Sequence, residues 1–427
     1  MKSKIPGWYF FKYLGNLMFS ILLLLIISFI SILGTIVEQD HSFEYYQEKY
    51  PVKTTGFFNW RVIEHFQLNQ IYTSWFFLTL ILVFSLSLII CTFSTQLPSL
   101  KNARQWKFKK NISVSKQLYT QEYKYFRSFS PIVCYLNQIE YYVFYQKNYI
   151  YAYKGLQGKL APVFVHLSIL LLLFGSLTSL FTSFSIQEMI PSGEIFNLQN
   201  IVKSGSLSNV PNNINGTVKH FEIDYYRNKS IKQFYSFLVI RDNENQKVKE
   251  QLISVNKPLY FKGLTIYQTD WQVNGLRLEI NGQENIQIPL KKLSSNNQVY
   301  WFATLQCNAS NSYSFILANI DGNISCYDRE GQLVHLLQLE QSNIIDYIPV
   351  KITDILLSTG LQIKQDSGVK IIYLSFLFLM LSIIASYLSY SQIWLTIDKA
   401  TVRISGTTNR AEINFEEDIY KLTKFLI

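Results

Sequence analysis

Residues 160–184 read LAPVFVHLSILLLLFGSLTSLFTSF, and this stretch decides the fold. It contains no Asp, Glu, Lys or Arg, and it exceeds the roughly 20 apolar residues that cross a bilayer as a helix. Charged side chains are costly in hydrocarbon, so such a stretch predicts a transmembrane helix. One histidine, His166, lies inside it.

Three further stretches have the same character, at residues 13–37, 71–93 and 371–394. The composition agrees with a membrane protein, because the chain is 48% hydrophobic and only 16% charged, with a mean hydropathy of +0.10. The first stretch is longer than the roughly 7 to 15 apolar residues of a cleaved signal peptide. We therefore expect four transmembrane helices, the first of them retained as an anchor.

Charge is distributed unevenly over the connecting segments. Residues 1–12 and 94–159 carry net charges of +3 and +9, residues 38–70 carry −2, and residues 185–370 are neutral. Because Lys and Arg near helix ends are retained on the inner side, the N-terminus and residues 94–159 are expected inside. Residues 38–70 and 185–370 are then outside, and residues 395–427 form a short inner tail.

The outer segment 185–370 is long enough for a domain with its own core. Residues 219–225 and 276–280 alternate apolar and polar side chains, as half-buried strands do. We expect a β-rich domain, a mostly antiparallel sheet or sandwich, between the third and fourth helices. Its tight turns are expected at four dipeptides, Asn215-Gly216, Asn274-Gly275, Asn281-Gly282 and Asp321-Gly322.

The inner segment 94–159 is basic at its start and aromatic near its end. Residues 141–145 and 149–153 predict a β-hairpin. Aromatic and basic mixtures can bind single-stranded nucleic acid, but beside two membrane helices a small folded lid on the lipid surface is favoured, since anionic headgroups attract Lys and Arg. The net charge of +10 is therefore attributed to the basic segments expected on the inner side of the membrane. No nucleic-acid partner is predicted.

His166 is the side chain most suited to chemistry, because no other histidine lies inside a predicted span. An imidazole in hydrocarbon needs a partner. Three alternatives remain open: an axial ligand of haem iron, a proton relay, or an interhelical hydrogen bond to a Ser or Tyr side chain. If His166 binds haem, a second axial histidine must come from another subunit.

The other reactive residue types give weaker signals. Metalloprotease, P-loop, dinucleotide-binding and GxSxG patterns are absent, so no catalytic residue is predicted, and no metal is expected beyond haem iron at His166. The cysteines form no CxxC or CxxCH motif, and spacing does not decide whether Cys307 and Cys326 pair. Four histidines are expected to be ordinary surface or interfacial residues, His41, His65, His220 and His335.

Four short motifs carry a family resemblance. The first helix exits through LGTIVEQ at 33–39, and the approach to His166 contains KG at 154–155 and GKLAP at 158–162. The most specific motif is YQTDW at 267–271, and the tail contains GTTNRA at 406–411, with Thr407 and Thr408 where glycines are expected. The motif residues singled out are Gly34, Thr35, Gln39, Tyr267, Gln268, Asp270 and Trp271.

In this order and on this topology, the motifs resemble the ResB-like (CcsB-like) family of System II cytochrome c biogenesis, in its plastid and cyanobacterial branch. The resemblance implies an assembly factor that acts with a CcsA-type partner as a subunit of a haem lyase complex, and presents transiently bound haem to apocytochromes c. It implies His166 as an axial haem ligand. It also implies the chloroplast thylakoid membrane, with residues 185–370 in the lumen and cytochrome f and soluble lumenal cytochrome c as recipients.

The alternative is a membrane-anchored sensor or scaffold whose outer β domain binds a ligand. A sensor would carry an inner output module, and residues 94–159 and 395–427 contain no kinase or nucleotide motif. A transporter usually has more spans or internal repeats, and no repeat is present. A scaffold would need no role for His166.

Overall fold

The computed structural model describes residues 11–52, 59–105, 108, 119–123, 128, 130–227, 231–242, 247–280, 284–295, 298–306, 312–318, 323–345, 348–398 and 401–424. It divides into a helical unit, Met1–Leu177 with Val369–Ile427, and a β unit, Thr178–Gly368. Four helices are long and apolar enough to cross a membrane. The predicted fold class, four such helices with a β-rich region between the third and fourth, is confirmed.

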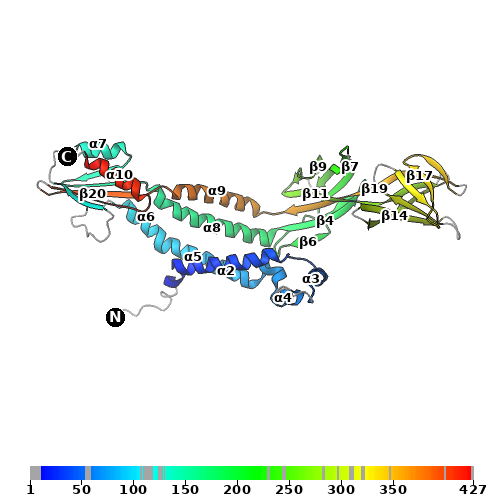
Figure 1. Cartoon of the computed structure of the whole chain (residues 1–427), viewed down its shortest axis with the longest axis horizontal. Coiled ribbons are helices and arrows are strands. Elements are labelled where there is room, and N and C mark those ends of the chain that lie inside the picture. Colours follow the sequence, from blue (N-terminus) through cyan, green and yellow to red (C-terminus); the bar gives the residue numbers. More distant parts are fainter. Residues whose placement is uncertain are drawn as a thin grey trace. The chain divides into compact units, whose positions relative to one another are not determined.

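The four helices are visible in Figure 1. They are α2 (Leu17–Ile36), α5 (Trp75–Cys91) with its continuation through the π-helical turn η2 (Thr92–Gln96) into α6 (Leu97–Arg104), α8 (Gln157–Thr182) and α9 (Val369–Ser386). The expected end of the fourth helix at residue 394 is wrong, because α9 ends at Ser386 and Trp394 lies in a strand. Hydropathy cannot separate a membrane helix from a buried strand that follows it.

Two hydroxyl contacts join α2 to α5. Ser20 Oγ and Ser87 Oγ are 2.7 Å apart, and Ser87 donates to the carbonyl oxygen of Leu14 at 2.6 Å. Small and hydroxyl-bearing residues hold membrane helices together because apolar surfaces gain little from leaving lipid. The short helices between α2 and α5 in sequence are α3 (Phe43–Lys49), α4 (Trp60–His65) and η1 (Leu68–Thr73).

A five-stranded antiparallel sheet, here called the composite sheet, joins two segments from opposite ends of the chain. Its strands in spatial order are β1 (Tyr119–Tyr123), β21 (Thr401–Thr408), β20 (Ser391–Asp398), β3 (Tyr149–Lys154) and β2 (Tyr142–Gln146). The expected hairpin is confirmed as β2 and β3. The C-terminal segment is no isolated tail, because β20 pairs along the whole of β3.

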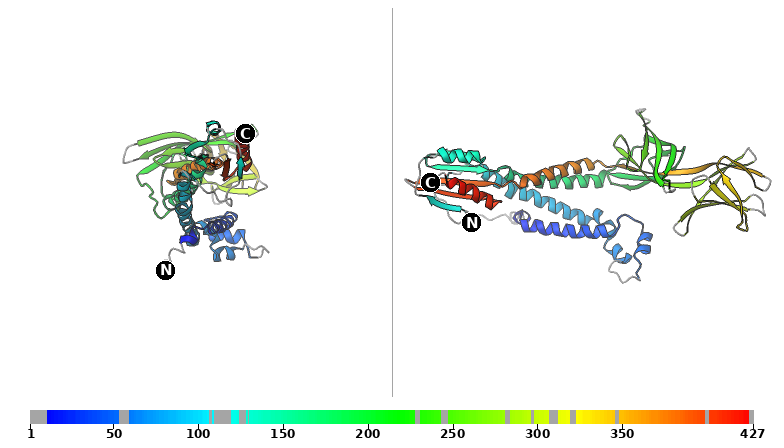
Figure 2. Two further views of the ribbon diagram at one scale, coloured as in Figure 1. Left: turned by 90° about the vertical axis from the view of Figure 1, so that its left-hand side faces the viewer. Right: turned by 45° about the horizontal axis from the view of Figure 1, so that its top comes forward.

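One face of the composite sheet is covered by α7 (Ser130–Gln138) and α10 (Glu412–Thr423), which lie beside it in Figure 2. Ile150 and Ala152 of β3 enter the shared core together with Ile393 of β20, and all three are buried. The alternate residue Tyr151 points to the other face, where its ring lies 5.9 Å from that of Trp394. Because side chains alternate along a strand, β3 contributes buried residues to both faces of the composite sheet.

The described part of the β unit contains three antiparallel sheets, where the sequence predicts a mostly antiparallel sheet or sandwich. Their spatial orders are β10-β11-β19-β4-β6 with β12 on β11 and β18 on β19, β5-β7-β8-β9, and β13-β14-β15-β16-β17. The strands are β4 (Phe184–Pro191), β5 (Ile195–Asn197), β6 (Ile201–Ser204), β7 (Ile214–Tyr225), β8 (Ile231–Asp242), β9 (Lys247–Ser254), β10 (Leu259–Phe261), β11 (Leu264–Ile280), β12 (Glu284–Pro289), β13 (Lys291–Ser295), β14 (Gln298–Gln306), β15 (Ser312–Leu317), β16 (Asn323–Tyr327), β17 (Leu333–Gln338), β18 (Ser342–Ile345) and β19 (Ile348–Gln365).

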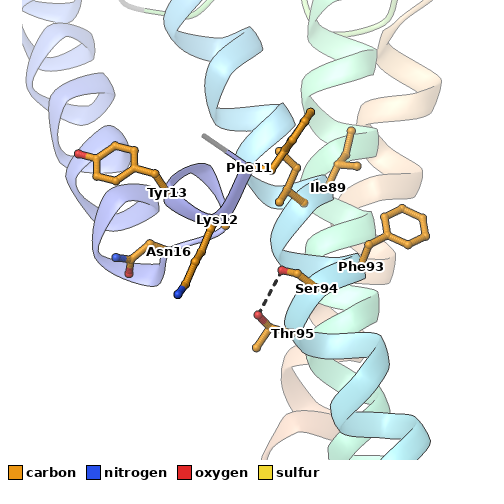
Figure 3. A pocket seen from close by; sticks show the side chains of 10 residues that line it. Phe11, Lys12, Tyr13, Asn16, Ile89, Phe93, Ser94 and Thr95 are labelled. Carbon is orange, nitrogen blue, oxygen red and sulfur yellow. Dashed lines mark hydrogen bonds between the residues drawn. The ribbon is translucent and has the colours of Figure 1, made fainter. Parts of the chain in front are cut away.

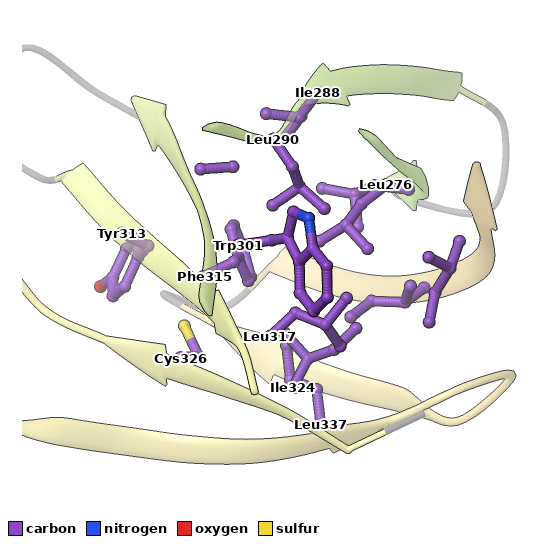
Figure 4. Close-up of a cluster of buried hydrophobic side chains, with 14 of the residues drawn as sticks. Leu276, Ile288, Leu290, Trp301, Tyr313, Phe315, Leu317, Ile324, Cys326 and Leu337 are labelled. Carbon is purple, nitrogen blue, oxygen red and sulfur yellow. The ribbon is translucent and has the colours of Figure 1, made fainter. Parts of the chain in front are cut away.

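The long strands β11 and β19 contribute to two separate cores. One core surrounds Trp301 and Phe315 and is drawn in Figure 4. The other contains Phe184, Leu238 and Leu361. The pairing of β11 with β19 shifts register three times, and the first shift, between Gln268 and Asp270, lies between the β11 residues of the two cores. The shared strands therefore bend where one core gives way to the other.

The expected turn role of two glycine dipeptides is wrong. Asn215-Gly216 lies inside β7 and Asn274-Gly275 inside β11. A Cβ on Gly216 would clash with the ring of Phe196, and one on Gly275 would lie 2.6 Å from the carbonyl oxygen of Ile288. Both glycines therefore permit close packing within strands rather than positive φ. Asn281-Gly282 and Asp321-Gly322 lie outside the described residues.

Candidate functional site

His166 lies on α8 and makes one hydrogen bond to the neighbouring helix. Its Nδ1 is 2.9 Å from Oγ1 of Thr92, and Thr92 also donates to the carbonyl oxygen of Leu88 at 2.7 Å. A hydroxyl carries a single proton, so with that proton directed at Leu88 its oxygen accepts from Nδ1–H of the imidazole. This arrangement leaves the lone pair on Nε2, the form of histidine that binds metals.

The histidine is half-buried, and within the described part of the chain its Nε2 has no hydrogen-bond partner. The contact to Thr92 resembles the outer-shell hydrogen bond that fixes the tautomer of a metal-binding histidine. No group of three or more His, Cys, Asp or Glu among the described residues could hold a metal ion. The geometry therefore fits a single axial ligand and not a chelating site.

Thr92 is a functional candidate that the sequence analysis missed. It is the first residue of the π-helical turn η2, and such turns often occur at functional positions in helices. The local signal was the cluster of Thr92, Ser94 and Thr95 at the end of an otherwise apolar run. Only the packing of α5 against α8 shows which of these hydroxyls meets His166.

The Gln39 side chain joins the end of α2 to the entry of α5. Its Nε2 donates to the carbonyl oxygens of Val37 and Leu68 at 2.7 and 2.8 Å, and its Oε1 accepts from the backbone N–H of Ile71 at 3.1 Å. All three amide contacts go to backbone groups, one at the end of α2 and two in η1. Gln39 therefore positions the connection between α2 and α5, and its contacts among the described residues do not indicate ligand binding.

Gly34 and Thr35 support the same connection. A Cβ on Gly34 would lie 2.9 Å from the ring of Tyr72, so only glycine lets that ring lie against α2. Thr35 Oγ1 and the Tyr72 hydroxyl both donate to the carbonyl oxygen of Ser31, at 2.9 and 3.1 Å. The first motif thus fixes the η1 segment against the end of α2.

The YQTDW motif lies at a β-bulge of β11. Gln268 is buried, and its amide oxygen accepts from Oγ of Ser236 at 2.8 Å and Oγ1 of Thr359 at 3.2 Å when the amide is oriented to satisfy both of its ends. The register with β19 shifts between Gln268 and Asp270, and the Asp270 carboxylate accepts from the backbone N–H of Trp271 at 2.8 Å. The motif therefore stabilises a bend in the β unit.

The aromatic residues of that motif differ in exposure. Trp271 is only partly buried, with its ring 5.8 Å from that of Trp301, and Tyr267 is 37% exposed. Trp301 is the more deeply buried indole, and the core packs around it rather than around Trp271. Tyr267 contributes a surface ring.

The other histidines lie in exposed positions. His41 stacks on Tyr45 with ring centroids 4.3 Å apart, His220 is 2.7 Å from the carboxylate of Glu222, and His65 and His335 are exposed. Cys326 is buried in β16, and Cys307 lies outside the described residues. Pairing of these two cysteines stays an open question.

Comparison with known proteins agrees with the resemblance that the motifs indicate. The model of the ResB-like family matches residues 17–337 and 286–420. The chain belongs to the ResB-like family. A protein of Porphyra purpurea named "Cytochrome c biogenesis protein Ccs1" is 43% identical over 424 residues, which cover 99% of this chain and 97% of the relative. Proteins of the same name from Gracilaria tenuistipitata var. liui and Thalassiosira pseudonana are 42% and 38% identical over 428 and 418 residues, covering 99% and 97% of this chain and 98% and 99% of those relatives.

The remaining motifs of this ResB-like chain anchor the composite sheet to the helices. Gly155 has a φ of +76°, and a Cβ there would clash with the carbonyl oxygen of Ser389. Arg410 donates to the carbonyl oxygen of Ser386 at 2.8 Å, and Asn409 Oδ1 accepts from the backbone N–H of Tyr390 at 2.7 Å. The tail motif thus caps the end of α9, and the threonines at 407 and 408 are compatible with this role.

Proposed function

We propose that this ResB-like protein is a cytochrome c biogenesis factor that acts when haem is delivered and attached to apocytochromes. The relatives that share nearly its full length carry that name. The observation that carries the haem assignment is the imidazole of His166, held at Nδ1 by Thr92 with Nε2 unpartnered among the described residues. Haem is then a cargo, bound transiently, and not a resident cofactor.

The donor set of the membrane helices fits this cargo. Haem iron accepts a neutral imidazole as axial ligand, and the Thr92 to Leu88 hydrogen bond selects that form of His166. The four apolar helices contain no second histidine. The second axial ligand therefore comes from a CcsA-type membrane partner, and the chain works as one subunit of a haem lyase complex.

The proposal extends to location and recipients. The charge asymmetry of the connecting segments supports an inner, stromal position for the composite sheet and an outer, lumenal position for the β unit. In a plastid thylakoid the recipients are cytochrome f and soluble lumenal cytochrome c. Reporter fusions after residue 427 and within 185–370 must then report opposite sides of the membrane.

The test replaces His166 in the full chain, co-expressed with a CcsA-type partner and an apocytochrome. His166→Gly should reduce holocytochrome by at least about tenfold and remove the bound-haem absorption of the complex, and added imidazole should restore part of both. Thr92→Val should weaken haem retention by roughly 10- to 100-fold, because it removes the partner of Nδ1. Ser176→Ala removes a hydroxyl of α8 that donates to the carbonyl oxygen of Leu172. It is the matched control and should leave both readouts unchanged.

A structural histidine would behave differently. Gln can hydrogen-bond to Thr92 but is a poor ligand of haem iron. Full cytochrome assembly by His166→Gln with an unaltered haem spectrum would therefore rule out the ligand role. Normal assembly by an inserted His166→Gly variant without imidazole would favour a scaffold that does not handle haem.

A further inference from the structure

A groove of about 950 Å³ lies between the helical turn before α2 and the end of α5. Its walls are apolar and include Tyr13, Ile89, Ile90 and Phe93. The rings of Tyr13 and Phe93 are more than half exposed, so nothing in the described chain covers the groove. In a membrane protein such a surface faces acyl chains or another molecule.

The polar side chains of this groove are drawn in Figure 3. Lys12 and Asn16 come from the segment at the start of α2, and Ser94 and Thr95 come from the π-helical turn η2. The Oδ1 atom of Asn16 already accepts from the backbone N–H of Met18 at 3.1 Å. What Asn16 can still offer to a ligand is its NH₂ group, a donor.

The hydroxyls of Ser94 and Thr95 differ from those of Ser85 in α5 and Thr92 in η2. Ser85 donates to Ile81 at 2.9 Å and Thr92 donates to Leu88 at 2.7 Å, as hydroxyls in apolar helices usually do. In the part of the chain that the structure describes, Ser94 and Thr95 contact only one another, at a long 3.4 Å. Both hydroxyls are therefore available to donate to a molecule in the groove.

The groove thus combines an ammonium, an amide NH₂ and two hydroxyls with apolar walls. No Asp or Glu is among its lining residues, so the group that fits beside Lys12 is an anion. Lys near a membrane surface attracts anionic headgroups, and its long stem can lie along apolar surface. We propose that this groove binds a membrane lipid with a negatively charged headgroup, with an acyl chain along Ile89, Ile90 and Phe93.

Haem is the competing amphiphilic anion. Its recognition in proteins generally includes an axial side-chain ligand such as His, Cys, Met or Tyr. Among the lining residues only Tyr13 belongs to that group, and it is one of the exposed wall residues. A lipid needs donors for its headgroup and apolar surface for its chain, and the groove supplies both.

The experiment uses the purified full chain, delipidated in detergent and titrated with phosphatidylglycerol or phosphatidylcholine, with bound lipid counted by native mass spectrometry. The wild-type chain should retain phosphatidylglycerol in preference to phosphatidylcholine. Lys12→Gln should weaken phosphatidylglycerol binding by roughly fivefold. The triple variant K12Q/S94A/T95V should lose the preference.

Two variants are matched controls. Lys101→Gln removes an exposed lysine of α6 that does not line the groove, and Ser85→Ala removes a hydroxyl that is bonded within its helix. Both should bind phosphatidylglycerol as the wild type does. Lys12 is an exposed side chain, so the single variant tests the proposal even if the triple variant fails to fold.

Three outcomes would overturn the proposal. The first is equal retention of both lipids by the wild-type chain. The second is an equal loss in Lys101→Gln, which would show general charge attraction. The third is stoichiometric displacement of phosphatidylglycerol by haem that Lys12→Gln abolishes, which would assign the groove to haem.

Discussion

The composite sheet and the β unit are both antiparallel sheets over apolar cores, but the chain builds them in different ways. The β unit uses one continuous segment, Thr178–Gly368. The composite sheet pairs β3 with β20, and the partners Tyr151 and Trp394 are separated in the sequence by α8, the β unit and α9. Its core forms only after both segments have come together.

The glycines show what this difference means for packing. In the composite sheet region, Gly155 and Gly158 lie against the carbonyl oxygens of Ser389 and Leu388, so backbones from distant parts of the chain touch. In the β unit, Gly331 has a positive φ of +82° but nothing within 4 Å of its Cβ position. Junctions between distant segments are therefore less tolerant of added atoms than local turns are.

Removing the second segment should have the largest effect. A chain ending at Tyr390 lacks β20, β21 and α10, which supply Ile393, Ile404 and Phe415 to the shared core. Residues 149–154 should lose most of their protection from hydrogen exchange, because β3 then keeps only β2 as a partner, and an isolated two-stranded hairpin is marginally stable in water. Peptides from 264–280 in the β unit should keep theirs, and loss of protection there as well would contradict the separation of the two units.

Trp301 tests the core of the continuous segment. Trp301→Ala should lower the free energy of unfolding of the β unit by roughly 3 to 5 kcal/mol, because the side chain is 8% exposed. The partly buried Trp271 should cost less, on the order of 1 to 2 kcal/mol when changed to Ala. Denaturant unfolding followed by circular dichroism measures both.

A conservative variant separates packing from hydrogen bonding at this position. Among the described residues the indole N–H of Trp301 has no hydrogen-bond partner. Trp301→Phe should therefore cost clearly less than Trp301→Ala. Equal losses in Trp271→Ala and Trp301→Ala would show that exposure does not rank the two indoles.

Gly155 lies where two distant segments touch, and Gly331 lies in a local turn, so substitution by Ala compares the two kinds of site. Gly155→Ala should destabilise the helical unit by roughly 2 to 3 kcal/mol, since positive φ and the clash with Ser389 act together. Gly331→Ala in the β unit meets only the backbone strain and should cost about 1 kcal/mol. Thermal unfolding of the two variants in the same detergent compares them, and equal shifts would remove the junction argument.

Asp418 provides the smallest effect, a dependence on pH. Burial raises the pKa of the Asp418 carboxyl above its ordinary value, while Lys154, the hydrogen bond that the Tyr141 hydroxyl donates at 3.3 Å, and Lys421 oppose this shift. The folded state therefore binds the proton more tightly than the unfolded state. The stability that the Asp418 carboxyl contributes is present below the ordinary pKa of about 3.9, and it is lost as the pH rises through the pKa of the folded state.

Asp418→Asn should accordingly stabilise the composite sheet at pH 7 and have no such effect near pH 3. The gain should stay under about 1 kcal/mol, because the carboxyl is half-exposed and solvent screens its charge. Hydrogen exchange of residues 149–154 at both pH values measures it. Destabilisation at pH 7 would show that the ionised carboxylate is favoured by its lysine neighbours.

Local patterns in the sequence determined much of this architecture. The four apolar stretches, the hairpin of β2 and β3 and the β-rich nature of 185–370 follow from hydropathy and alternation, which depend on neighbouring residues only. The same patterns identified His166 as the histidine inside a span.

Contacts between distant residues were decided only by the tertiary structure. Thr92 and His166 are 74 positions apart, and no local pattern pairs them. The end of α9 at Ser386 and the strand that follows depend on a partner strand, β3, far earlier in the chain. Gly216 lies in β7, paired with β8, instead of in a turn, and its missing side chain leaves the space that the ring of Phe196 occupies. Apolar side chains specify that burial occurs, whereas the identity of the partner depends on packing of the whole chain.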